Sequence, residues 1–229
     1  VKQHTSFPRD IESGIVKMVS IGLGKAEGAR LVHRLGPIGY ADVLPEWARI
    51  AIDNTPVAYG IGIVENAHHE AAVIEGAEPE DFHTVDAGLL VQAKRLLSKL
   101  PLGQIDVLVV EMLGKNISGS GMDPAVSGRA DIRGKDNPAE PFVHKLVLLG
   151  VTPESHGNGL GVGVADFTTK AVADGLDLYA MYLNATTATS IEKVRIPPVL
   201  ADDEQAIRAA VASSWRLDGE NARLCVIRS

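Results

Sequence analysis

Residues 105–124 have the sequence IDVLVVEMLGKNISGSGMDP, and they predict the fold class of this chain. The run at 105–110 is almost continuously apolar, which is typical of a strand covered on both faces. Residues 144–149 repeat the pattern. Ligands of open α/β sheets bind beyond the carboxyl ends of the strands. We therefore expect function in the polar, glycine-rich residues that follow each of these two strands.

The periodicity of the remaining sequence predicts helices and strands in alternation. An α/β fold follows, with a mixed, mostly parallel sheet, helices on both faces, and functional loops at the strand carboxyl ends. We expect residues 1–54 to be an N-terminal segment that completes a cofactor site, and residues 55–229 to be the α/β domain. Helices are predicted at 25–35, 44–54, 84–100, 163–176 and 202–213, and strands at 56–64, 70–74, 105–110, 144–149 and 224–227. Residues 177–183 are predicted to continue the preceding helix or to form a turn.

Composition excludes several kinds of protein. The net charge is −7 and no basic tract is present, which argues against nucleic acid as a partner. Cys225 is the only cysteine, so an intrachain disulfide framework, a cysteine zinc site and an iron–sulfur cluster are excluded. No apolar run is long enough to span a membrane. The low cysteine content leads us to expect a cytoplasmic protein. The start at Val1 suggests a missing N-terminal part, and a homo-oligomer stays open.

The first glycine-rich loop, residues 114–129, has the features of a ligand-binding loop. Its glycines let the backbone approach a ligand, and its amides can form an anion nest. We expect cofactor contacts from Lys115, Asn116, Ser118 and Asp123. The loop lacks the order of a Walker A motif and of a dinucleotide fingerprint. The alternative is an ordered connector in which Asp123 makes a turn.

The second glycine-rich loop, residues 155–166, follows the strand predicted at 144–149. Parallel strands would place it beside the first loop. His156 is a candidate proton carrier or ligand, and Asn158 and Asp166 are candidate cofactor contacts. The alternative is a glycine-rich turn that carries a surface histidine.

The N-terminal residues offer a different kind of chemistry. Lys17 lies among glycines, where a lysine can be a covalent attachment point or an anion contact. His33 lies on the next predicted helix and is a candidate metal ligand. The alternatives are a solvated lysine and a histidine that packs or caps a helix.

The same residues resemble the lactate racemase superfamily, whose members carry a nickel-pincer nucleotide. The resemblance rests on the pair His4-Thr5, on Ser13-Gly14 before Lys17, and on His33 sixteen residues after Lys17. It implies attachment of the nucleotide to Lys17, nickel ligation by His33 and proton transfer by His4. The spacing from His4 to Lys17 is wider than in the family, and the family's N-terminal half is missing here. The chain therefore resembles a divergent branch rather than lactate racemase itself.

The resemblance implies a racemase or epimerase that acts on a small 2-hydroxy acid by hydride abstraction and return through the nucleotide. Histidines would move the hydroxyl proton, and Lys115 or Arg129 would hold the substrate carboxylate or the cofactor phosphate. Two alternatives stay open. One is a cofactor-independent enzyme or nucleotide-dependent oxidoreductase that uses the two loops. The other is a non-catalytic domain for small-molecule binding or subunit interaction.

Overall fold

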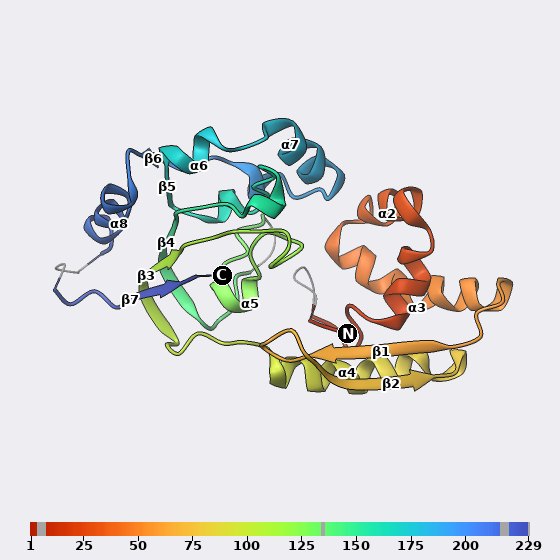
Figure 1. Ribbon diagram of the computed structural model, residues 1–229. Helices are drawn as coiled ribbons and strands as arrows, with labels where there is room; N and C mark the ends of the chain where they lie inside the picture. Colours follow the sequence, from red (N-terminus) through yellow and green to blue (C-terminus); the bar gives the residue numbers. More distant parts are fainter. Residues whose placement is uncertain (4–7, 134–135, 216–219, 229) are drawn as a thin grey trace. The chain divides into compact units, whose positions relative to one another are not determined.

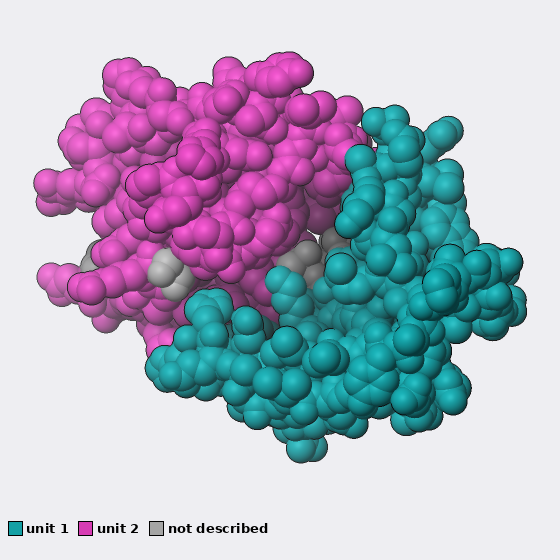
Figure 2. Space-filling model, turned by 45° about the vertical axis from the view of Figure 1, so that its right-hand side comes forward, with its two compact units in different colours: residues 1–98 teal, residues 99–229 magenta. Residues whose placement is uncertain are grey.

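The computed structural model describes residues 1–3, 8–133, 136–215 and 220–228 (Figure 1). The chain forms two compact units, Val1–Ser98 and Lys99–Ser229, coloured separately in Figure 2. The sequence predicted a boundary after residue 54. The difference arises because residues 60–96 pack with the N-terminal helices: Ala77 and Phe82 share a buried cluster with Ile15 and Val16.

Unit 2 is built on a five-stranded, all-parallel sheet with the order β6-β5-β4-β3-β7. This confirms the predicted α/β fold. The strands are β3 (Gln104–Val110), β4 (Phe142–Leu148), β5 (Phe167–Thr169), β6 (Val199–Leu200) and β7 (Leu224–Ile227).

Both faces of the sheet are covered, which explains the continuous apolar runs. Alternate residues of β3 enter different clusters: Leu108 packs with Met181 of α7 (Leu178–Thr187), whereas Val107 packs with Ala206 of α8 (Asp203–Ala212). Figure 1 shows α8 on one side of the sheet. The shorter elements of unit 2 are α5 (Pro124–Ser127), η3 (Pro153–Ser155), η4 (Val162–Val164), α6 (Lys170–Asp174) and η5 (Ile191–Val194).

Unit 1 packs helices against a two-stranded antiparallel hairpin. The helix α4 (Phe82–Leu96) buries Leu89 against Val64 of the hairpin. None of the helices in the described parts of the chain has the length and apolarity of a membrane span. The elements are α1 (Ile15–Lys17), η1 (Met18–Gly22), α2 (Lys25–His33), α3 (Gly36–Asn54), β1 (Gly60–Glu65), β2 (Ala71–Ala77), η2 (Pro79–Asp81) and α4.

One sequence prediction of a helix is wrong, and one helix is longer than predicted. Residues 163–176 do not form one helix, since η4 is followed by β5 and only then by α6. The β-branched Thr168 is fully buried and donates its hydroxyl to the Leu148 carbonyl at 2.8 Å, so this segment completes the sheet. The helix predicted at 44–54 begins eight residues earlier, at Gly36. The pair Gly36-Pro37 starts α3, because proline suits the first turn of a helix.

An ion pair between Arg223 and Asp106 adds to the backbone pairing of β7 with β3, and acid should break this ion pair. Both Nε and the backbone N–H of Arg223 donate to Asp106 Oδ2 at 2.9 Å. The hydrogen bond from Arg223 is the main cause that lowers the pKa of Asp106 below its ordinary value of 3.8. A carboxyl with a lowered native pKa stabilises the fold above its unfolded-state pKa, and this contribution is lost as the pH falls through the native pKa.

We therefore expect hydrogen-exchange protection of the β7 amides to stay constant above about pH 5 and to fall progressively below it. Asp106→Asn should lower this protection at neutral pH and remove the acid step. Asp174→Asn, which breaks an exposed pair with Lys170, is the control and should keep the step. An acid step of the same size in Asp106→Asn would contradict the assignment.

Candidate functional site

The two glycine-rich loops lie side by side at the carboxyl ends of β3 and β4. Parallel pairing continues past both strands: Leu113 N–H donates to the Gly150 carbonyl at 2.9 Å, and Thr152 N–H donates to the Leu113 carbonyl at 2.8 Å. The predicted adjacency of the loops is therefore confirmed.

Close packing between the loops accounts for two of their glycines. Gly121 has a φ of +89°, and a Cβ there would lie 1.7 Å from the Leu160 carbonyl oxygen. Gly161 has a φ of +110°, and a Cβ there would lie 3.1 Å from Gly121 Cα. Such left-handed positions favour glycine. These two glycines therefore serve loop-to-loop packing.

Lys115 and Asn116 are held by side chains of the neighbouring segment. Lys115 N–H donates to Ser155 Oγ at 3.0 Å, and the Lys115 ammonium donates to Asn184 Oδ1 on α7. The hydroxyl of Thr152 donates to Asn116 Oδ1 at 2.8 Å. Burial lowers the pKa of Lys115. The structure thus brings Lys115 beside Asn184, a residue that the sequence did not single out.

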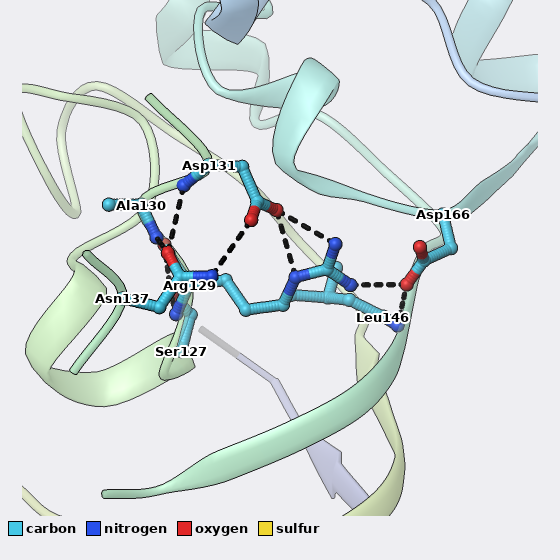
Figure 3. Close-up of polar contacts among 7 residues, drawn as sticks. All are labelled: Ser127, Arg129, Ala130, Asp131, Asn137, Leu146 and Asp166. Carbon is cyan, nitrogen blue, oxygen red and sulfur yellow. Dashed lines mark hydrogen bonds and ion pairs between the residues drawn. The ribbon is translucent and has the colours of Figure 1, made fainter. Parts of the chain in front are cut away.

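Arg129 and Asp166 form an ion pair with each other (Figure 3). The guanidinium also contacts Asp131 Oδ2 through Nη2 at 2.8 Å, and Asp166 Oδ2 accepts from Leu146 N–H at 2.7 Å. Burial by itself would lower the pKa of Arg129, but the bonds to Asp166 and Asp131 outweigh it and raise the pKa. Arg129 therefore has two carboxylate partners within the chain and joins the first loop to β4.

Two further predicted residues, Asp123 and Ser118, have local contacts, and His156 has none through its side chain in the described residues. Asp123 caps α5 by accepting the Ala125 N–H at 2.9 Å, and the Ser118 hydroxyl lies 3.3 Å from that of Ser120. His156 is exposed, with a φ of +48° in the turn after η3. The structure shows no side-chain hydrogen bond for His156 within the described residues. Nothing in this geometry brings His156 to the other candidates.

In unit 1, Lys17 ends a short helix that a buried carboxylate holds in place. Asp86 of α4 is 2% exposed, and its two oxygens accept the N–H groups of Ile15 at 2.9 Å and of Val16 at 2.8 Å. A Cβ on Gly14 would lie 2.3 Å from Asp86 Oδ1, so glycine is needed there. Burial raises the pKa of Asp86, and the two amide bonds oppose that rise.

Lys17 lies close enough to His33 for its charge to act on the imidazole. Burial lowers the pKa of Lys17, and the charge of Lys2 lowers it further. Burial also lowers the pKa of His33, and the charge of Lys17 adds to this effect. Neither side chain has a hydrogen-bond or ion-pair partner in the described residues. The His33 ring lies 6.1 Å from the Tyr40 ring, centroid to centroid. His4 lies outside the described residues.

Asp86 and Asn184 were not predicted as functional residues from the sequence. The signal for Asp86 was its position on the apolar face of α4, between Phe82 and Leu89, where a carboxylate needs buried partners. Asn184 gave no comparable signal, because one asparagine on a helix has no distinctive pattern.

The chain was compared with protein-family models, with curated proteins and with solved structures, and no match was found.

Proposed function

We propose that this chain belongs to a racemase or epimerase of small 2-hydroxy acids that uses a nickel-pincer nucleotide, with Lys17 as the attachment point and His33 as a nickel ligand. One observation carries the proposal. Lys17 and His33 are partly buried neighbours in unit 1, and neither has a polar partner in the described residues. No side-chain nitrogen or oxygen of the described residues is both buried and without a partner, so the polar atoms of these two side chains are open to solvent and accessible to an added group.

The chemistry of both side chains fits such a group. A lysine forms covalent bonds through its neutral amine, and burial favours that form of Lys17. A histidine binds metals through its neutral imidazole, and burial with the charge of Lys17 favours that form of His33. In the described residues no three His, Cys, Asp or Glu side chains gather as a metal site. A metal inside a chelating nucleotide needs fewer protein ligands, so one histidine is compatible with it.

The chain's own residues would hold and orient the group. When bound, the nucleotide supplies the redox step at C2 of the 2-hydroxy acid through which the configuration is exchanged. Asp86 fixes the backbone before Lys17, and His33 is placed by α2 on the same unit. We assign proton transfer at the substrate hydroxyl to His4, on the resemblance alone. The acidic composition argues against nucleic acid as a partner, and the single cysteine fits a cytoplasmic protein.

The test is intact mass and metal analysis of the protein made together with the enzymes that synthesise the nucleotide. We expect a mass increment that peptide mapping places on Lys17, together with bound nickel. Lys17→Arg should lose the increment, because a guanidinium is not a comparable nucleophile. Lys25→Arg, an exposed lysine of the same unit, is the matched control and should keep it.

His33 is tested separately from attachment. His33→Ala should keep the increment on Lys17 and lose most of the nickel, whereas His68→Ala, at an exposed position, should keep both. Absence of both increment and nickel in the unaltered protein would refute the proposal. Dinucleotide binding that survives Lys17→Arg would favour an oxidoreductase that uses the loops.

A further inference from the structure

Three polar side chains meet at one atom in unit 2. The Lys115 ammonium and Asn158 Nδ2 both donate to Asn184 Oδ1, the latter at 3.4 Å. Because the oxygen of Asn184 accepts both bonds, its own amide hydrogens point away from them. The ammonium and the two amides, grouped around one oxygen, therefore keep further N–H donors that these two bonds do not use.

This group of donors has a positive charge without a carboxylate partner. Arg129, the other cation of the two loops, is paired with Asp131 and Asp166. Lys115 forms no ion pair with any side chain in the described residues, and its ammonium bonds to the neutral amide of Asn184. A partly buried ammonium with only neutral partners gains most from an added anion.

The backbone on both sides of the group is fixed before any ligand arrives. Lys115 N–H is bonded to Ser155 Oγ, and Ser155 is 5% exposed. The Ser155 hydroxyl lies 2.8 Å from the Thr152 hydroxyl, which holds it in turn. On the other side, Asp177 N–H donates to the Gly157 carbonyl at 2.9 Å and so ties the start of α7 to the second loop. Donors on such a fixed frame lose little entropy on binding.

We propose that Lys115, Asn158 and Asn184 form an oxyanion-binding site at the carboxyl ends of β3 and β4, which takes the carboxylate or phosphate group of a small ligand. A fixed ammonium flanked by amide donors is suited to either group. The site lies wholly within unit 2. It does not depend on the attachment of a nucleotide to Lys17, so the two proposals can fail separately.

The experiment is a titration of the full chain, made without the nucleotide enzymes and labelled with ¹⁵N at asparagine side chains. Inorganic phosphate and glycolate are the two probes, and sodium chloride keeps the ionic strength constant. We expect saturable shifts of the Asn158 and Asn184 amide signals. A response to phosphate alone or to glycolate alone supports the site and identifies its anion. No saturable shift with either probe would overturn the proposal.

Substitutions of lysine test whether anion binding depends on the charge of Lys115. Lys115→Met should weaken anion binding about tenfold or more, since it removes a charge-assisted hydrogen bond. Lys170→Met is the control, because Lys170 is exposed and paired with Asp174 in the same unit. Equal affinity in Lys115→Met and in the unaltered chain would overturn the proposal.

Asn184→Asp separates binding from folding. The new carboxylate would pair with Lys115, so we expect an unchanged or raised melting temperature together with loss of anion binding. A stable Asn184→Asp protein that binds phosphate or glycolate as tightly as the unaltered chain would also overturn the proposal.

Discussion

Gly121→Ala is expected to lower the free energy of unfolding of unit 2 by about 2–5 kcal/mol. The residue has a φ of +89°, which an alanine adopts only with strain. Its Cβ would also lie 1.7 Å from the Leu160 carbonyl oxygen, and this atom belongs to backbone that cannot turn aside. The two glycine-rich loops would have to separate. Chemical denaturation of the full chain, followed by a probe in unit 2, measures the loss.

Gly119→Ala is the matched control for that substitution. Gly119 lies in the same loop, and a Cβ there would have no atom within 4 Å. We expect a change within about 0.5 kcal/mol, as for most surface substitutions. If Gly121→Ala and Gly119→Ala were equally stable, this result would contradict the close packing of the first loop against the second.

Asp86→Ala is expected to destabilise unit 1 by about 2–5 kcal/mol and to prevent modification of Lys17. The substitution leaves the buried N–H groups of Ile15 and Val16 without their acceptors. Each unsatisfied buried amide costs about 1–3 kcal/mol. The helix that ends at Lys17 would lose its position relative to α4. Thermal unfolding and the mass increment on Lys17 are the two measurements.

Two glycine substitutions extend the test of Asp86: Gly14→Ala as a second disruption and Gly88→Ala on α4 as a control. Gly14→Ala should show a comparable loss, because its Cβ would overlap the Asp86 carboxylate. Gly88→Ala lies two residues from Asp86 on α4, where a Cβ meets nothing within 4 Å. It should stabilise the helix by up to about 1 kcal/mol and leave Lys17 reactive. Unchanged stability in Asp86→Ala would contradict the role of Asp86 in holding the N-terminal helix.

Local sequence patterns were sufficient for several elements of both units. The apolar runs of β3 and β4, the hairpin of β1 and β2, and the helix α8 with Asp202 as its cap follow from periodicity and capping within short windows. The adjacency of the two glycine-rich loops followed from parallel pairing. The segment at 163–176 was misassigned because its helical spacing competes with a buried strand position, and the neighbouring β4 favours the strand.

The contacts of the candidate site could not be predicted in this way. From the sequence, Arg129 was a candidate to bind the anionic group of a ligand. In the structure it pairs with Asp166, which lies 37 residues away along the chain. Asp86 holds the backbone at Ile15 across 71 residues, and Asn184 meets Lys115 across 69 residues. A single sequence records which residues are present and their local period. Partners that lie this far apart along the chain are chosen by the packing of whole strands and helices, and only the folded chain brings them together.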